Sequence, residues 1–158
     1  MSIAIYAGSF DPITNGHLDI LKRGAEIFDK VVIAVSYNIE KKGFLPVETR
    51  VKLIKDAVSN MDNVEVDSYE GLTVEYAKSK NAKILLRGLR STMDFEYELQ
   101  LSQINKALNS DIQTVFLMAN SESNFISSSM IRDILKNNGD ISQFVPQNVC
   151  EYFIKHDV

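Results

Sequence analysis

A histidine stands at the start of a predicted helix, in the segment 14-TNGH-17, which follows a strand-like run at 3–9. If Thr14 caps the helix, Gly16 and His17 lie in its first turn, where backbone N–H groups are unpaired. The helix dipole disfavours a protonated imidazole there, so we expect His17 to be neutral and to donate one N–H. Gly16 has no side chain, so a ligand can approach the backbone closely. This pattern suits a phosphate oxygen that gains charge in a transition state.

Other groups that bind phosphate follow the later predicted strands. Lys41 follows the second strand, the segment 87-RGLR-90 follows the fourth, and the segment 121-SESNFISSS-129 follows the fifth. Arginines bind phosphate through two parallel hydrogen bonds, and a serine cap and an anion use the same N–H groups at a helix start. Taken singly, each feature has a simpler interpretation, such as a surface histidine, a solvated lysine, a charged strand exit or an ordinary cap. Their shared position after strands favours one anion-binding edge.

The remaining polar residues predict neither a metal site nor an activated nucleophile. The acidic residues Asp94 and Glu96 are expected on a solvated helix face, and Phe10 and Phe125 in the core or in a pocket wall. There is no paired-carboxylate motif at the strand ends and no serine–histidine–aspartate set. The chain has two histidines, too few for a histidine-rich metal cluster. Its single cysteine is expected to be a small core or surface residue.

The alternation of strand and helix patterns predicts how these residues are brought together. The unbroken apolar run at 31–37 is typical of a parallel strand covered on both faces. Five strands are expected at about 3–8, 31–37, 63–69, 83–88 and 112–119. Helices are expected at about 17–28, from Pro46 to 58, after Thr73 as an N-cap, at 92–109, at 128–138 and at 147–156. With right-handed crossovers, this order predicts an α/β fold with a doubly wound five-stranded parallel sheet.

Composition and length limit the function classes. With 158 residues, of which 45% are hydrophobic, the chain is expected to form a single domain over 1–158. A formal net charge of −4 argues against a general nucleic-acid coat. The sequence begins with a strand pattern and has no apolar run of membrane-spanning length, so no signal peptide and no membrane partner are expected. The expected location is the cytoplasm.

These residues carry a family resemblance. The segment 8-GSFDPITNGH-17 resembles the (S/T)-x-G-H phosphate-binding motif of the nucleotidyltransferase superfamily. Together with 87-RGLRSTMDFEYELQ-100 and 126-ISSSMIR-132, it makes the chain resemble the bacterial phosphopantetheine adenylyltransferases from the first strand to about Pro146. The resemblance implies a Rossmann-like nucleotidyltransferase fold. It also implies reversible transfer of the adenylyl group from ATP to 4′-phosphopantetheine, giving dephospho-coenzyme A and pyrophosphate, the penultimate step of coenzyme A biosynthesis.

The resemblance also implies roles for individual residues. His17 would stabilise the transition state at the α-phosphate, with Lys41, Arg87 and Arg90 as further catalytic residues. The pantetheine substrate would contact Ser9, Lys41, Thr73 and Arg87. The ATP site would comprise Ser9, Phe10, His17, Gly88, Leu89, Arg90, Glu98, Ser123, Asn124, Phe125, Ile126, Ser127, Ser128 and Ser129. Mg2+ would assist, carried mainly by the ATP phosphates. The family is usually a homohexamer, a dimer of trimers, and feedback by coenzyme A is plausible for it.

A few positions depart from the family pattern. Ser9 stands where threonine is more usual, which preserves the hydroxyl, and Ala7 stands where proline is expected. Gly71 stands where an acidic or polar residue is expected, and Thr73 stands where an apolar residue is expected. Ser123 stands where an aromatic residue is expected. These departures bear on the detail of the pocket and leave the chemistry unchanged.

Three other functions compete with this interpretation. The nearest is a sister nucleotidyltransferase that acts on nicotinamide or nicotinate mononucleotide, or on glycerol phosphate with CTP. A second is a nucleotide-binding regulatory module without catalysis, which would not need a donor at the α-phosphate. A third, an RNA-binding fragment similar to a tRNA synthetase, fits poorly with an acidic chain that has no anticodon-binding part. The segments 87–90 and 126–129 favour the pantetheine enzyme.

Overall fold

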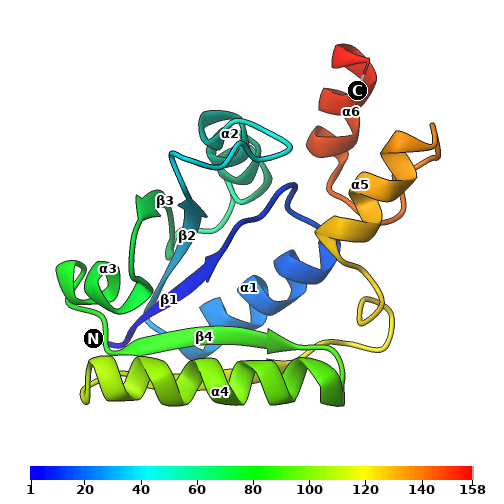
Figure 1. The fold of residues 1–158 in the computed structure, drawn as a ribbon. Helices are drawn as coiled ribbons and strands as arrows, with labels where there is room; N and C mark the ends of the chain where they lie inside the picture. Colours follow the sequence, from blue (N-terminus) through cyan, green and yellow to red (C-terminus); the bar gives the residue numbers. More distant parts are fainter. Residues whose placement is uncertain (158) are drawn as a thin grey trace.

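The computed structural model describes residues 1–157, which fold into parallel strands alternating with helices (Figure 1). The strands are β1 (Ile3–Gly8), β2 (Lys30–Tyr37), β3 (Val64–Glu70), β4 (Ile84–Leu89) and β5 (Gln113–Met118). The helices are α1 (Asn15–Ile27), α2 (Val47–Ala57), α3 (Thr73–Ser79), α4 (Thr92–Leu108), α5 (Ser128–Lys136) and α6 (Gln147–His156). The expected α/β alternation is confirmed. Within residues 1–157, none of the helices has the length and apolar character needed to cross a membrane.

The five strands form one parallel sheet in the order β3-β2-β1-β4-β5. The chain first builds outward from β1 to β3 and then returns to add β4 on the other side of β1. In the register between these central strands, Tyr6 pairs with Leu86. Such a reversal of direction opens a crevice at the carboxyl ends of β1 and β4, where ligands of doubly wound folds bind. The predicted fold class is confirmed, and its topology places the end of β1 next to the end of β4.

Alternating residues of the strands feed two separate cores. On one face, Ala4, Tyr6 and Leu86 pack with buried residues of α1, α2, α5 and α6. On the other face, Ile5 and Leu85 pack with the buried side chains of α3. Strands β1 and β2 are therefore buried on both sides, as their continuous apolar sequences predict. In Figure 1, the carboxyl ends of the central strands point towards the side of the molecule that carries α5 and α6.

Helix α4 differs from the other helices, because it contributes no apolar side chain to either core. The sequence aligns Tyr97, Ile104 and Leu108 on one face, but these side chains are 65%, 56% and 53% exposed. The one buried side chain of the helix is that of Glu98. Helical spacing of apolar residues on this face is therefore not accompanied by packing inside the chain. The face is available for contact outside the chain.

Two local expectations also need correction. The fourth strand was expected to end at Gly88, but Leu89 also belongs to β4 and pairs with Met118 of β5, so only Arg90 of the segment 87–90 follows the strand. Thr73 was expected to cap α3, but Leu72 is the N-cap residue. The Thr73 hydroxyl instead lies 2.7 Å from the hydroxyl of Tyr69. Both differences arise because pairing and side-chain contacts beyond the segment decide where an element begins and ends.

Candidate active site

The start of α1 holds His17 in a reciprocal capping arrangement. Thr14 has extended backbone geometry, and its side-chain oxygen accepts a hydrogen bond of 3.3 Å from the His17 N–H. In return, the Thr14 N–H donates to Nδ1 of His17 at 3.1 Å. In a neutral imidazole, one nitrogen accepts and the other carries the proton. Because Nδ1 accepts from the backbone, we assign the proton to Nε2, which leaves that N–H as the free donor.

His17 is neutral in this environment. Burial, followed by the positive charges of Arg90 and Arg87, lowers the pKa of His17 to about 4. The edge of the imidazole meets the ring of Phe10, with 5.0 Å between ring centroids. The expectation of an uncharged imidazole therefore agrees with the pKa, although burial and the two arginines, not the helix dipole, are its identified causes.

His17 faces a cleft at the carboxyl ends of β1 and β4. Helix starts and loops complete the walls, and Gly16 of α1 lies among the lining residues. The residues predicted for the site that line this cleft are Ser9, Phe10, His17, Arg87, Gly88, Arg90, Glu98, Ser123, Ile126, Ser127 and Ser128. The cleft therefore gathers the first loop, the end of β4 and the segment before α5, as the sequence pattern predicts.

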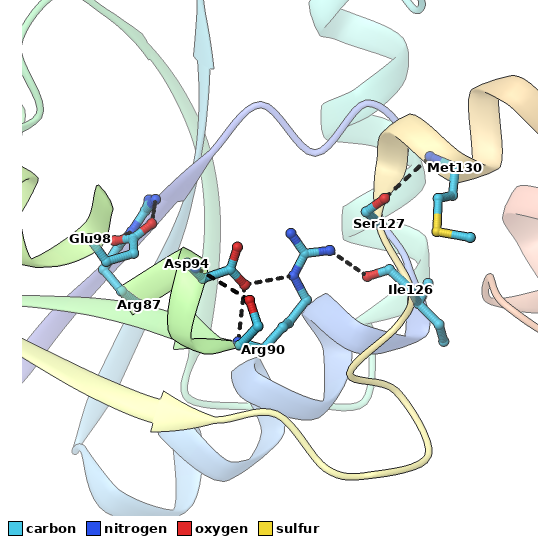
Figure 2. Close-up of polar contacts among 8 residues, drawn as sticks. Arg87, Arg90, Asp94, Glu98, Ile126, Ser127 and Met130 are labelled. Carbon is cyan, nitrogen blue, oxygen red and sulfur yellow. Dashed lines mark hydrogen bonds and ion pairs between the residues drawn. The ribbon is translucent and has the colours of Figure 1, made fainter. Parts of the chain in front are cut away.

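Arg87, which lines the cleft, is held in place by three short hydrogen bonds. Its Nε and Nη2 donate to the two carboxylate oxygens of Glu98 at 2.8 and 2.6 Å (Figure 2). Its Nη1 donates to the carbonyl of Ala7 at 2.7 Å. Burial alone would lower the pKa of Arg87, but the hydrogen bonds and charge of Glu98 raise it above its usual value. Glu98 was expected in the ATP site, and its carboxylate is occupied by this pair.

Arg90 is held more loosely at the rim. Its backbone N–H and its Nε donate to one oxygen of Asp94 at 3.1 and 3.2 Å, and its Nη1 donates to the carbonyl of Ile126 at 3.2 Å (Figure 2). Arg90 therefore spans the mouth of the cleft from the first turn of α4 to the segment before α5. Asp94 was expected on a solvated helix face, and this expectation is wrong, because Asp94 lines the cleft. The four-residue spacing from Arg90 was the available signal.

The start of α5 offers backbone donors to the cleft. Ser127 is the N-cap, and its side-chain oxygen accepts from the N–H of Met130 at 3.2 Å (Figure 2). Ser128 uses its hydroxyl to donate to the carbonyl of Pro12 at 2.7 Å, which ties the helix start to the first loop. Within residues 1–157, the N–H groups of Ser128 and Ser129 have no hydrogen-bond acceptor. Unpaired N–H groups at a helix start are an anion-binding arrangement.

Six predicted site residues do not line the cleft. Lys41 is exposed in the loop after β2, where its N–H bonds the carbonyl of Asn38 at 3.1 Å. Thr73 is engaged with Tyr69. Phe125 is 53% exposed and its ring packs edge-on against Phe144. The others outside the lining are Leu89, Asn124 and Ser129.

Two buried charged residues that the sequence did not single out shape the first loop. The carboxylate of Asp11 accepts the N–H groups of Phe44 and Leu45 at 2.7 and 2.8 Å. Arg50 of α2 donates to the carbonyl of Ser9 at 2.8 Å. These bonds join the loop that carries Ser9 to the segment that follows Lys41. The only sequence signal for Arg50 was a charge on the apolar stripe of its helix.

Comparisons with known proteins show which family the chain belongs to. The family model described as cytidylyltransferase-like matches residues 5–134. A phosphopantetheine adenylyltransferase of Nautilia profundicola is 51% identical over 148 residues, which cover 94% of this chain and 96% of the relative. Proteins of the same name from Clostridium novyi and Crocosphaera subtropica are 48% and 52% identical and cover 98% and 93% of this chain, and 96% and 94% of their own lengths. The chain belongs to the phosphopantetheine adenylyltransferase family.

A solved structure with the same architecture comes from a protein of a different name. The putative nicotinate-nucleotide adenylyltransferase of Vibrio parahaemolyticus superposes with a TM-score of 0.71 at 19% identity, covering 98% of this chain and 99% of that one. At this identity, the likeness shows the fold alone. The phosphopantetheine adenylyltransferase family therefore follows from the sequence relatives, and the structural neighbour supports the nucleotidyltransferase fold independently.

Proposed function

We propose that this chain reversibly transfers the adenylyl group of ATP to 4′-phosphopantetheine and so forms dephospho-coenzyme A and pyrophosphate. This is the penultimate step of coenzyme A biosynthesis. Membership of the phosphopantetheine adenylyltransferase family supports the substrates. The observation that carries the chemistry is the neutral His17, whose Nδ1 is occupied by the Thr14 N–H, so that Nε2–H is the donor available to the cleft.

The reaction joins two polyanions, so positioning and charge matter more than proton abstraction. The phosphate of 4′-phosphopantetheine is already an anion and attacks the α-phosphorus in line with the leaving pyrophosphate. A new phosphorus–oxygen bond forms as the bond to the β-phosphate oxygen breaks, and no general base is needed. His17 Nε2–H donates to an α-phosphate oxygen as the phosphorus becomes pentacoordinate.

The other cleft residues take complementary roles in this proposal. Arg90 and the unpaired N–H group of Ser128 bind the β- and γ-phosphates. Ser129 lies outside the cleft lining and remains a predicted contact of ATP. Arg87 is oriented by Glu98 and directs its remaining N–H groups to the incoming phosphate. Lys41 and Thr73 remain predicted contacts of the pantetheine side, together with Ser9.

Magnesium enters this proposal as part of the substrate, as MgATP. Within residues 1–157, no group of three or more histidine, cysteine, aspartate or glutamate side chains is gathered for a metal ion. The two carboxylates of the cleft, those of Asp94 and Glu98, are both paired with arginines. The phosphates are therefore the main ligands that the site offers, and turnover that persists after removal of magnesium by a chelator would contradict this role.

The direct test is incubation of the chain with MgATP and 4′-phosphopantetheine, with detection of dephospho-coenzyme A. The same assay with nicotinate mononucleotide, or with glycerol phosphate and CTP, separates the sister activities by pyrophosphate release. His17→Ala is expected to keep most of its ATP affinity while kcat falls by roughly 100- to 1,000-fold, because one transition-state donor is lost. Equal losses in binding and turnover would contradict the role of His17.

The exposed face of α4 supports assembly into a homohexamer, a dimer of trimers. Four of its exposed large apolar side chains, those of Met93, Tyr97, Ile104 and Leu108, lie on one side of the helix. A contiguous apolar face of this kind marks an interaction surface. Ile104→Lys is expected to lower the mass measured by light scattering, whereas Ile154→Lys, at an exposed position of α6, leaves it unchanged. A monomeric parent protein would rule out the hexamer.

Two further roles belong to the same proposal. Coenzyme A, which shares the pantetheine arm of the product, is expected to compete at this cleft as a feedback inhibitor. Inhibition measured against varied 4′-phosphopantetheine tests this, and the absence of competition would contradict it. The cytoplasm, where ATP is supplied, is the proposed location.

A further inference from the structure

Asp94 is the one cleft residue whose charge opposes the binding of a polyphosphate and is not needed to hold a buried cation. Its side chain is 29% exposed, and one carboxylate oxygen lies 3.2 Å from the Nε of Arg90. The side chain of Arg90 is 41% exposed and lines the cleft, so an anion in the cleft can reach it. An anion bound in the cleft and the Asp94 carboxylate therefore compete for the guanidinium group of Arg90.

The position of Asp94 makes this competition local. Asp94 lies in the first turn of α4, and Ser91 caps that helix by accepting the Asp94 N–H at 3.3 Å. The backbone of Asp94 is thus fixed independently of its side chain. Its carboxylate also accepts the backbone N–H of Arg90 at 3.1 Å, so the carboxylate stays at the rim when the guanidinium moves away.

We propose that Asp94 is a positioning residue that competes with the nucleotide phosphates for Arg90 and thereby weakens the hold of the enzyme on pyrophosphate. This inference rests on the proposed function. In the free enzyme, Asp94 and the Ile126 carbonyl keep Arg90 across the mouth of the cleft (Figure 2). When ATP binds, its phosphates take Arg90 from Asp94. After the chemical step, Asp94 recovers Arg90 and favours the departure of pyrophosphate.

The competition makes a prediction that a structural role does not. Asp94→Asn keeps the shape of the side chain and an oxygen that accepts hydrogen bonds, but removes the negative charge. The affinity for pyrophosphate is expected to rise roughly two- to fivefold, the scale of an exposed ion pair. A residue that only supported the local fold would lower the affinity or leave it unchanged when altered.

The experiment measures binding of pyrophosphate to the whole protein by isothermal titration calorimetry. Glu96→Gln is the matched control, since Glu96 lies two residues away on the same helix, is exposed and is outside the cleft lining. The control is expected to change the affinity for pyrophosphate less than about twofold, because it alters only the distant charge. Pyrophosphate affinity in Asp94→Asn that is equal to or weaker than in the control overturns the proposal.

A second pair of variants tests whether Asp94 acts through Arg90. In an Arg90→Ala background, Asp94→Asn is expected to leave the pyrophosphate affinity unchanged within error, because the guanidinium for which Asp94 and pyrophosphate compete is absent. The same increase in both backgrounds would mean direct repulsion of the ligand and would overturn the positioning role. Wild-type turnover of 4′-phosphopantetheine is measured alongside. If it is absent, the proposed function fails, whereas normal turnover with unaltered pyrophosphate binding in Asp94→Asn refutes only the role of Asp94.

Discussion

The two arginines of the cleft are both paired with carboxylates of α4, yet they are held in different ways. Arg87 and Glu98 form a two-point pair, and their side chains are 26% and 9% exposed. Arg90 and Asp94 form a one-point pair, in which the Nε of Arg90 lies 3.2 Å from one carboxylate oxygen of Asp94, and their side chains are 41% and 29% exposed. Because Asp94 and Glu98 are four residues apart, they lie on the same side of the helix. One helix face therefore supplies a rigid pair and an adjustable pair.

The two pairs suit different roles, since the Arg87–Glu98 pair is held in place and the Arg90–Asp94 pair can exchange its partner. Moving Arg87 away from Glu98 would leave a largely buried carboxylate without a partner, which is strongly unfavourable. Arg90 can leave Asp94 at little cost, because water solvates both groups. A site that binds and releases polyphosphates needs both: a fixed group that orients one reactant and a cation that can change partners in each turnover.

The largest effect is expected from removing the carboxylate of the rigid pair. Glu98→Ala leaves the largely buried Arg87 without its counter-charge and should lower the free energy of unfolding by about 3 kcal/mol. Asp94→Ala should cost less than about 1 kcal/mol. Urea unfolding followed by circular dichroism measures both. Similar losses for the two variants would break the distinction between the pairs.

The second effect concerns the neutral imidazole near both arginines. His17 has a folded-state pKa of about 4, below the value of about 6.5 expected for the unfolded chain. Between these two pH values, His17 is protonated in the unfolded chain but neutral in the folded protein, so falling pH lowers the free energy of unfolding. The contribution is fully present above about pH 6.5, falls away towards pH 4 and amounts to at most about 3 kcal/mol.

The comparison of wild type with His17→Gln isolates this contribution, because the carboxylates that titrate in the same range are common to both proteins. The free energy of unfolding is measured by urea titration at several values between pH 4 and 7. Wild type should lose more stability than the variant as the pH falls. Parallel curves would show that His17 is not held neutral by the fold.

The sequence predicted the elements that depend on local pattern. The continuous apolar run of β2, the capped start of α1 at Thr14 and the serine cap of α5 at Ser127 all follow from side-chain spacing and capping chemistry. These elements carry the neutral histidine and the unpaired N–H groups of α5. The cleft that they form was therefore accessible to sequence reasoning once the sheet was assumed to be parallel.

What the sequence did not reveal depends on contacts between distant segments. The partner of Arg87 is Glu98, eleven residues later, and nothing local distinguishes that carboxylate from Asp94 or Glu96. The apolar face of α4 has helical spacing, but spacing does not say whether the face packs inside the chain or against another molecule. Lys41 follows a strand as expected, yet the loop that carries it lies outside the cleft lining.

A third, smaller effect tests the geometry of the two guanidinium groups. Arg87→Lys loses the two-point contact with Glu98 and should lower the free energy of unfolding by about 1 to 2 kcal/mol. Arg90→Lys should change it by less than about 0.5 kcal/mol, because an exposed lysine can still approach Asp94. Thermal unfolding of the two variants gives the comparison. A larger loss for Arg90→Lys would reverse the assignment of the rigid and adjustable pairs.

The smallest effect uses His17 as a probe of local charge. Arg90→Gln removes a cation that lowers the pKa of His17 and should raise that pKa by roughly half a unit. The double variant Arg87→Gln/Glu98→Gln removes a pair with no net charge and should shift it less. The chain has two histidines, so NMR titration of the imidazole C–H signals resolves His17, with His17→Gln as the assignment control. Equal shifts in the two variants would mean that Glu98 does not neutralise Arg87, and the contrast between the pairs would then rest on geometry alone.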